Sequence, residues 1–414
     1  MEPDRAGDSG TPGDAGGLEL GDVLASLAPW PEDGSRADGP VAVDATDRLL
    51  LDEAHALLAH AGPDDVVVIG DHFGALTVGA AALGVPRVRL HTDAVTAEQA
   101  VLANLRAAQA GPLQGTQLDL GVHEGLEPAL VRGARVVLLQ LPRSLAELQE
   151  VAELVAREAA DDVVLLAGGR VKHMTHGMND VLATCFADVR ATLARGKSRL
   201  LVATGPRPAA REAATSFPVT AVLHDAELLA AADLPSDGAV TVVAHGGVFA
   251  GPALDLGTRA LLRTADRWPA AVDAVDLGSG TGLLASVLAL RDAATRVVAT
   301  DRSAAATASA RATAVANGVG ERVTALRDDV GAGEADASAD LVVCNPPFHD
   351  RASVSTDAAH RMFAAAARIL RPGGELWCVY NSGLRYRPAL ERTVGPTTQV
   401  SRDTRFTVTR SVSR

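Results

Sequence analysis

Both halves of the chain contain the same short plan, a run of strand-forming residues that ends in a glycine turn. It reads VVVIGDHFG at residues 66–74 and AVDLGSGTG at residues 274–282. Two further pairs of segments follow in the same order: VRLHTD (88–93) with RVVATD (296–301), and ARVVLLQLPRS (134–144) with ADLVVCNPPFH (339–349). This internal duplication predicts two domains of one fold and excludes a solenoid of short repeats.

The second half indicates the fold class most clearly, because strand and helix patterns alternate from residue 272 onward. Strands are expected at 272–277, 296–301, 322–327, 339–344 and 374–380, and helices after the glycine turn, at 302–317 and near 357–370. Strands that alternate with helices build a parallel sheet with helices on both faces. The closing segments, TTQVSRD and TRFTVTRSV, predict a hairpin at one edge of that sheet. The sequence therefore predicts an α/β protein with two tandem Rossmann-like domains.

Length and composition agree with two folded domains that follow an acidic tail. The chain has 414 residues, too many for one ordinary core, and 47% of them are hydrophobic. We expect a disordered tail at 1–40, a first domain at 41–205, a linker and lead-in segment at 206–245, and a second domain at 246–414. No stretch of about 20 apolar residues lacks charge, so no membrane span or membrane partner is expected. The N-terminal residues do not have the pattern of a signal peptide.

Charge and cysteine usage narrow the setting of the protein. The net charge of −13 argues only weakly against a nucleic-acid partner, because local basic patches rather than the total meet phosphate. The three cysteines, Cys185, Cys344 and Cys378, are scattered without metal-ligand spacing. We therefore expect no metal site, and a reducing cytoplasm is the location that fits best.

The glycine turn of the second copy has the form of a ligand-binding loop. Its residues Asp276, Gly278, Gly280 and Gly282 follow a strand and precede a helix. The glycines let the backbone turn sharply and let a ligand lie against it without Cβ clashes. Asp301 ends the next strand, where a carboxylate can accept both hydroxyls of an adenosyl ribose. By themselves, these residues also fit a tight strand-to-helix turn and a helix N-cap.

A nicotinamide-dependent enzyme would share these features, and two observations argue against one. Asp276, at the start of the loop, suits a cationic or amine-bearing ligand better than a pyrophosphate. The fourth strand ends in Asn-Pro-Pro-Phe, which a dehydrogenase does not need. After the third strand, Asp328 and Asp329 either offer a carboxylate to an adenine amino group or lie in a solvated turn.

A stiff stretch follows the fourth strand and consists of Asn345, Pro346, Pro347 and Phe348. An exocyclic amine of a nucleobase is a poor nucleophile, because its lone pair is delocalised into the ring. The Asn345 side-chain oxygen and the Pro346 carbonyl can accept its N–H bonds and turn the lone pair toward an incoming methyl group. The prolines fix φ and remove competing donors, and Phe348 offers a face to a flipped base. The simpler alternative is a strand that prolines terminate, with Phe348 in the core.

In this order, the motifs resemble class I S-adenosylmethionine-dependent methyltransferases, and more narrowly the bacterial ribosomal RNA guanine-N2 methyltransferases with duplicated domains. The resemblance covers about residues 40–414 and includes GGVFAGPALDLGTRALL (246–262), AGGRVKHMTHGMNDVL (167–182), NSGLRYRPALER (381–392) and RFTVTR (405–410). It implies S-adenosyl-L-methionine as the cofactor, held by Asp276, Gly278, Gly280, Gly282 and Asp301. It further implies a target-amine site at Asn345, Pro346, Pro347 and Phe348, and a substrate guanine in ribosomal RNA or a ribosomal subunit.

The first copy keeps the scaffold of the fold and lacks its chemistry. His72 and Phe73 stand where the second copy has Gly280 and Thr281, and QLPR (140–143) replaces Asn-Pro-Pro-Phe. We therefore expect a degenerate methyltransferase-like domain that grips RNA, or else one that only buries an apolar face of the second copy. Candidate RNA contacts, each of which also fits an ordinary solvated surface, are Arg170, Lys172, His173, His176, Arg385, Arg387, Arg405 and Arg410.

Other functions stay open at the level of the sequence. An Asn-Pro-Pro-Phe stretch also fits enzymes that methylate adenine N6 or the glutamine amide of a protein. A catalytically idle RNA-binding or assembly protein is a further alternative; the intact second copy argues against it, although the first copy demonstrates that such loss occurs. We expect the chain to act as a monomer.

Overall fold

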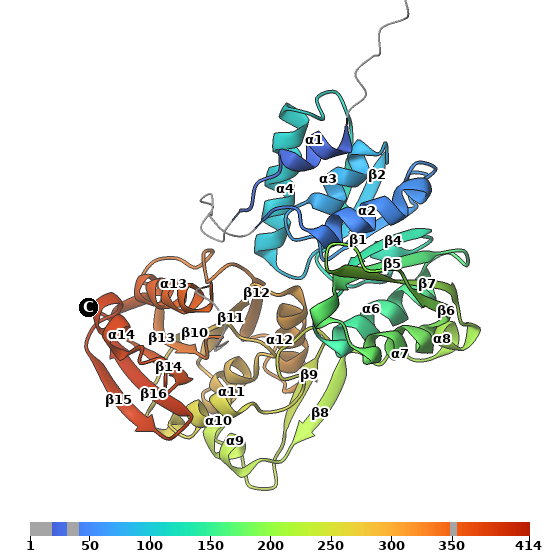
Figure 1. Cartoon of the computed structure of the whole chain (residues 1–414). Helices are drawn as coiled ribbons and strands as arrows, with labels where there is room; N and C mark the ends of the chain where they lie inside the picture. Colours follow the sequence, from blue (N-terminus) through green and yellow to red (C-terminus); the bar gives the residue numbers. More distant parts are fainter. Residues whose placement is uncertain (1–18, 31–40, 348–353) are drawn as a thin grey trace, which may run out of the picture.

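The computed structural model describes residues 19–30, 41–347 and 354–414 of the chain. Two α/β units lie side by side, the first coloured blue to green and the second yellow-green to red (Figure 1). Each unit has one seven-stranded sheet with helices packed on both faces. Phe348 and most of the predicted tail lie outside the described residues.

The two sheets have the same strand order and the same directions, which confirms the duplicated α/β fold. Across the first sheet the strands are β3 (Asp119–Val122), β2 (Arg87–His91), β1 (Val66–Ile69), β4 (Val136–Gln140), β5 (Val164–Arg170), β7 (Ser198–Pro206) and β6 (Phe186–Ala191). Across the second they are β12 (Val323–Arg327), β11 (Arg296–Asp301), β10 (Asp273–Leu277), β13 (Ala339–Cys344), β14 (Leu370–Asn381), β16 (Phe406–Val412) and β15 (Thr397–Arg402). In each sheet five parallel strands are extended by two strands in antiparallel pairing, so the predicted C-terminal hairpin is confirmed.

Helices cover both faces of each sheet, because central parallel strands such as β1 and β10 are buried on both sides. In the first copy, one face is covered by α1 (Leu20–Ala25), α2 (Ala45–Leu58), α3 (Ala75–Ala82) and α4 (Val95–Ala110), and the other by α5 (Pro128–Val131), α6 (Leu145–Glu158), α7 (His176–Cys185) and α8 (Pro208–Glu212). In the second, α9 (Ala226–Ala231), α10 (Leu256–Leu262), α11 (Leu283–Arg291) and α12 (Ala304–Ala316) cover one face, and α13 (Val354–Ile369) and α14 (Arg387–Thr393) the other. Two short 3-10 helices lie at Val171–His173 and Ala265–Arg267.

The segment predicted as a linker, 206–245, is folded, and this part of the prediction is wrong. Its strands β8 (Val219–Leu223) and β9 (Val240–Ala244) form a small antiparallel sheet. β9 lies along α12, where the Val243 amide donates to Thr313 Oγ1 at 3.0 Å. The segment also contributes buried leucines and valines to the core of the second copy. The alternation of strand formers in VTVVA was the available signal.

The predicted disorder of residues 1–40 is also wrong for the part that the structure describes. Residues 20–25 form α1, and Val23 and Leu24 are buried in the core of the first copy. Leu20, Val23, Leu24 and Leu27 have the i, i+3, i+4, i+7 spacing of an amphipathic helix. The acidic, glycine-rich surroundings concealed this pattern.

The two copies have separate hydrophobic cores. Among the described residues, no buried hydrophobic cluster combines side chains of the first sheet with side chains of the second. Hydrogen bonds and ion pairs connect the copies instead, for example between His245 and Glu150, 2.6 Å apart. The described contacts therefore do not favour the alternative in which the first copy only buries an apolar face of the second.

No helix in the described ranges is long and apolar enough to cross a bilayer.

Candidate active site

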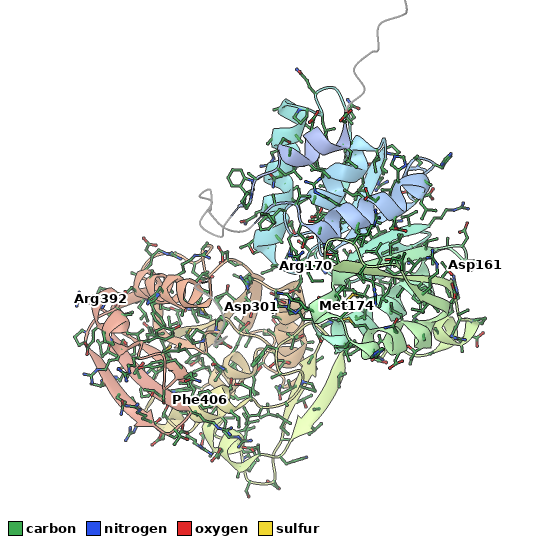
Figure 2. The ribbon with its side chains drawn as sticks, in the orientation of Figure 1. Asp161, Arg170, Met174, Asp301, Arg392 and Phe406 are labelled. Carbon is green, nitrogen blue, oxygen red and sulfur yellow. The ribbon has the colours of Figure 1, made fainter. Side chains whose placement is uncertain are left out.

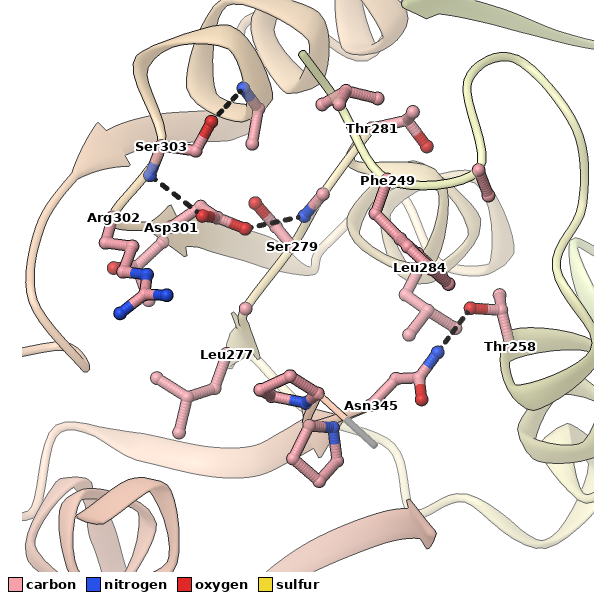
Figure 3. A pocket seen from close by; sticks show the side chains of 18 of the residues that line it. Phe249, Thr258, Leu277, Ser279, Thr281, Leu284, Asp301, Arg302, Ser303 and Asn345 are labelled. Carbon is pink, nitrogen blue, oxygen red and sulfur yellow. Dashed lines mark hydrogen bonds between the residues drawn. The ribbon is translucent and has the colours of Figure 1, made fainter. Parts of the chain in front are cut away.

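The second sheet brings the sequence motifs together at the carboxyl ends of its central strands. Leu277 at the end of β10 lies level with the ends of β11 and β13. The segments that follow these strands therefore meet at one cavity of about 550 Å³, seen from close by in Figure 3. Open α/β sheets bind their ligands at this edge. The predicted residues that line the cavity are Gly278, Gly280, Asp301, Asp328, Asp329, Asn345, Pro346 and Pro347.

Two predicted residues are placed elsewhere, and a third is not described. Asp276 and Gly282 are not among the residues that line the cavity, and Phe348 lies outside the described residues. Gly282 is needed for packing, because a Cβ there would lie 2.7 Å from the Cα of Ala310 in α12. Gly280 differs: its φ is 53°, and a Cβ would meet no described atom within 4 Å. The open backbone that a ligand can approach is therefore at Gly280.

Asp276 holds the helix that follows the glycine turn. Its side chain is fully buried, and Oδ2 accepts a hydrogen bond of 3.0 Å from the Ala285 amide in the first turn of α11. The N-cap of α11 is Gly282, which has no side chain, so an acceptor for this amide must come from another residue. Burial raises the pKa of Asp276 to about 7. Asp276 therefore stabilises the start of α11 and does not line the cavity.

Asp301 lines the cavity and fixes two backbone segments around it. One carboxylate oxygen accepts from the Gly280 amide at 3.0 Å and the other from the Ser303 amide at 2.9 Å (Figure 3). The N-cap of α12 is Ser303, whose Oγ accepts from the Ala306 amide, so the N-cap alternative for Asp301 does not hold. Burial, followed by the nearby charge of Asp93, raises the pKa of Asp301. Each oxygen retains acceptor capacity toward the cavity.

Asp328 and Asp329, the acidic pair after β12, have different partners. Asp329 forms an ion pair with Arg361 of α13. Asp328 Oδ2 accepts a 2.8 Å hydrogen bond from the Gly333 amide, and its carboxylate has no ion pair in the described structure. Both line the cavity, and Asp328 is the better candidate to meet an amino group.

Asn345 is held in one orientation by its neighbours. Its Nδ2 donates to Thr258 Oγ1 at 3.0 Å and to Asp255 Oδ1 at 3.3 Å. An ionised carboxylate only accepts hydrogen bonds, so the amide nitrogen must face Asp255 and the oxygen must face away. That oxygen, Oδ1, is buried without a hydrogen-bond partner among the described residues. The arrangement leaves one buried acceptor beside the cavity, ready for an N–H donor.

Sequence reasoning missed the residues that orient Asn345. Asp255 caps α10 by accepting from the amides of Gly257 and Thr258, and the same carboxylate oxygen reaches Asn345. The Asp-x-Gly-Thr pattern before an apolar helix is an N-cap signal, but it does not indicate a partner 90 residues away. The cavity also has Phe249 and the first-copy residue Asp93 in its lining, neither of which the sequence indicated.

The corresponding place in the first copy is a smaller cavity of about 290 Å³. Gln140, in the position of Asn345, donates to Asp47 on α2 just as Asn345 donates to Thr258 on α10. Burial raises the pKa of Asp47 to about 7. Phe73 occupies part of the glycine turn and packs against the core of its own copy. The first copy therefore keeps a side-chain amide, that of Gln140, fixed by a hydrogen bond, but its turn offers no open glycine backbone beside this amide.

Comparison with known proteins decides the family. Residues 24–207 match the RLMG N-terminal domain, and residues 239–410 match the Methyltransferase small domain. The Ribosomal RNA large subunit methyltransferase G of Streptomyces avermitilis is 34% identical over 391 residues, which are 94% of this chain and 97% of that protein. The chain belongs to the ribosomal RNA large subunit methyltransferase G family. The resemblance drawn from the motifs is confirmed at this level.

A further relative agrees with this family, and a solved structure shares the fold. The protein of the same name from Pseudomonas paraeruginosa is 34% identical over 371 residues, covering 89% of this chain and 92% of that protein. The T. thermophilus 16S rRNA N2 G1207 methyltransferase in complex with AdoMet and guanosine has a TM-score of 0.67 and 22% identity. The match covers 95% of this chain and 99% of that one, so the whole two-copy fold is shared.

The predicted RNA contacts of this methyltransferase lie on both copies. The exposed candidates of the first copy are Arg170, Lys172, His173 and His176, and those of the second are Arg385, Arg387 and Arg405. Arg170 and Met174 lie on the first copy and Phe406 on the second (Figure 2). Arg410 is half-buried and pairs with Glu375, which makes it the weakest candidate.

Proposed function

We propose that this chain transfers a methyl group from S-adenosyl-L-methionine to the exocyclic N2 amine of a guanine in large-subunit ribosomal RNA. The names of its relatives support the RNA and the subunit. The observation that carries the chemistry is the buried, unpartnered Oδ1 of Asn345 beside the cavity. A buried acceptor without a donor costs about 1–3 kcal/mol, so the site favours a ligand that brings an N–H group.

The residues of the cavity fit the proposed cofactor. Asp301 would accept the ribose hydroxyls, since each of its oxygens is already fixed by one backbone amide. Gly280 would let the ligand approach the backbone, because no described atom occupies the space beside it. Asp328 would accept from the adenine amino group. When bound, the cofactor supplies a methyl group on a sulfonium sulfur, which the amine nitrogen takes up as the carbon–sulfur bond breaks and one amine proton leaves.

Asn345 and Pro346 would hold the target amine. Asn345 Oδ1 accepts one N–H bond and the Pro346 carbonyl the other, which directs the nitrogen lone pair toward the methyl group. Thr258 and Asp255 keep the Asn345 amide from rotating, so little reorganisation is needed when the base arrives. Pro347 fixes the backbone that carries these acceptors. A role for Phe348 in stacking the base stays a prediction.

The first copy would hold the RNA. Arg143, Arg170 and His173 line its smaller cavity, and the charge of Lys172 acts on His173. Desolvation, together with the charges of Lys172, Arg143 and Arg170, lowers the pKa of His173, as expected where cations crowd one another. Asp44, which pairs with Arg170, lines the same cavity, so Arg143 and Lys172 are the positive charges of this cluster that favour contact with phosphate. Contacts between the first copy and RNA phosphates would offset the free energy needed to extrude a base, which is about 2–4 kcal/mol.

Calorimetry on the full chain tests the cofactor assignment. We expect one S-adenosyl-L-methionine per chain, with Asp301→Ala weakening binding by about 1–3 kcal/mol. Asp273→Ala is a matched control, because Asp273 lies at the opposite end of the sheet in ion pairs with Arg296 and Arg371. Two equal sites, or an Asp301→Ala variant that binds like the wild type, would contradict the assignment.

The proposal includes a monomer that works in the cytoplasm on ribosomal RNA. Support for a reducing compartment comes from Cys185, Cys344 and Cys378, which are buried and form no disulfide. Light scattering coupled to size exclusion, at the concentration used for activity, tests the monomer. A dimer that loses activity on dilution would overturn it.

A further inference from the structure

The two copies meet at equivalent places in their folds. Asp93, which follows β2 in the first copy, corresponds to Asp301 at the end of β11 in the second. Next to these residues, Ala94 and Ser303 form an isolated antiparallel bridge. Backbone hydrogen bonds of 2.9 and 2.8 Å between the copies lie on its two sides. The strand end that carries the predicted ribose contact is thus joined directly to its degenerate counterpart.

The Asp93 side chain caps a helix of the other copy. Its Oδ1 accepts from Ser303 Oγ at 2.9 Å and from the Ala305 amide at 2.9 Å, in the first turn of α12. Ser303 is the N-cap of that helix, and its own Oγ accepts from the Ala306 amide at 3.1 Å. Because Ser303 donates its single hydroxyl proton to Asp93, its lone pairs are directed at the helix. Asp93 therefore fixes both the cap and the start of α12.

From this cap, a continuous set of hydrogen bonds reaches the cavity. The Ser303 amide donates to Asp301 Oδ1 at 2.9 Å, and Asp301 Oδ2 accepts from the Gly280 amide at 3.0 Å. Asp93 is itself among the residues that line the cavity. A displacement of Ser303 would thus move the carboxylate that is the candidate ribose acceptor, and with it the open glycine backbone.

A second contact holds the neighbouring strand. Arg327 ends β12, directly before Asp328, and its side chain is only 7% exposed. Its guanidinium pairs with Glu98 at 2.6 Å and donates to the Thr92 carbonyl at 2.7 Å and to the Asp93 carbonyl at 3.3 Å. The first copy consequently contacts the ends of both β11 and β12. At the end of β12, two of the three partners of Arg327 are backbone carbonyls, which a side-chain substitution leaves in place.

We infer that Asp93 is a positioning residue of the S-adenosyl-L-methionine site, through which the first copy completes the cofactor pocket of the second. This inference rests on the proposed function. It assigns the degenerate copy a task beyond holding RNA. The carboxylate of Asp93, which corresponds to that of Asp301, positions the Asp301 carboxylate of the intact copy. The task depends on the position of a hydrogen-bond acceptor and not on negative charge, since a second carboxylate near Asp301 opposes ionisation there.

Three substitutions in the full chain separate position from charge. Asp93→Ala removes the acceptor, and the dissociation constant for S-adenosyl-L-methionine should rise about tenfold, the scale of a lost hydrogen bond to a charged group. Asp93→Asn keeps an acceptor without charge and should stay within about threefold of the wild type. Asp93→Glu keeps the charge but moves the oxygens by one methylene, so it should resemble Asp93→Ala. In Asp93→Ala and Asp93→Glu, the loss in cofactor affinity should exceed any loss in kcat at saturating cofactor, because these substitutions act on the cofactor pocket and leave Asn345 in place.

Glu98→Ala is the matched interface control. It removes one charged partner between the copies while Arg327 keeps its two carbonyl acceptors and the Asp93 side-chain contacts stay intact. We expect Glu98→Ala to lower the thermal unfolding midpoint at least as much as Asp93→Ala, with cofactor affinity within about threefold of the wild type.

The outcomes of calorimetry and thermal unfolding are decisive together. Equal cofactor affinity in the wild type and Asp93→Ala overturns the inference, as does an equal loss in Glu98→Ala, which would indicate general loosening of the interface. If Asp93→Ala does not fold, the comparison of Asn with Glu decides, because a role through charge predicts the opposite order. A wild type that binds no S-adenosyl-L-methionine refutes the proposed function itself, whereas binding that is indifferent to Asp93 refutes only this inference.

Discussion

Replacing Asn345 by alanine is the sharpest chemical test of the site. The substitution removes the buried amide oxygen that has no hydrogen-bond partner among the described residues and lies beside the cavity. It leaves Asp301 and Gly280, the main candidate cofactor contacts, in place. Binding of the cofactor and orientation of the amine should therefore separate in this variant.

The expected size of the effect follows from the contacts of Asn345. Its Nδ2 is held at 3.0 and 3.3 Å by Thr258 and Asp255, so Oδ1 is already oriented before the base arrives. Loss of such a preorganised contact lowers kcat by about 100-fold or more, which corresponds to about 2.7 kcal/mol in the barrier. Thr258→Val, which removes one of the two acceptors that hold the amide, should cost about tenfold in kcat. Cofactor affinity should stay within about threefold in both variants.

Single-turnover methylation of large-subunit RNA with labelled cofactor, alongside calorimetry for cofactor binding, measures both quantities. The Asp273→Ala protein is again the control for unspecific damage, since its ion pairs lie at the far end of the sheet. Near-normal turnover by Asn345→Ala would refute the role assigned to the amide. A loss of cofactor affinity as large as the loss of rate would refute the separation of the two sites.

Three further predictions use other parts of the structure. Gly282→Ala should lower the thermal unfolding midpoint, because its Cβ would lie 2.7 Å from α12, whereas Gly280→Ala should mainly weaken cofactor binding. The prediction is contradicted if thermal unfolding shows the larger loss for Gly280→Ala and calorimetry shows the larger loss for Gly282→Ala. Burial raises the pKa of Asp276 to about 7, so the folded state binds its proton more tightly than the unfolded chain does. The stability of the wild type relative to Asp276→Asn should therefore fall between about pH 4 and pH 7 and then level off. Urea unfolding in which this difference does not depend on pH would contradict the prediction. Lys172→Ala, which removes an exposed charge of the first copy, should weaken RNA binding and make its salt dependence shallower by about one unit of slope, while Arg211→Ala, an arginine already paired with an aspartate 2.8 Å away, should leave the slope unchanged.

Much of the second copy could be predicted from sequence because its motifs sit at strand ends. Parallel strands place their carboxyl ends at one sheet edge, so Asp301 and Asn345 had to approach the glycine turn once the strands were identified. The duplication supplied the same fold for the first copy, whose sheet has the identical order.

The misses share a physical cause, which is that they depend on contacts between distant segments. Asp276 was expected at the ligand, but Gly282 cannot cap α11, so the buried carboxylate is used for that purpose. Asp255 and Asp93 each carry an N-cap or turn signal of their own, and only the fold reveals that they reach Asn345 and Ser303. Local patterns predict elements well, whereas the partner of a side chain is set by packing.

Mass mapping of methylated guanines in the RNA of both ribosomal subunits tests the central claim most directly. Cells that lack this protein should be complemented with the wild type or with Asn345→Ala at matched expression. We predict that one N2-methylguanine is missing from the large-subunit RNA without the protein, returns with the wild type and stays absent with Asn345→Ala. An unchanged set of guanine marks, a missing mark on adenine or on a protein glutamine, or full restoration by Asn345→Ala would contradict the account.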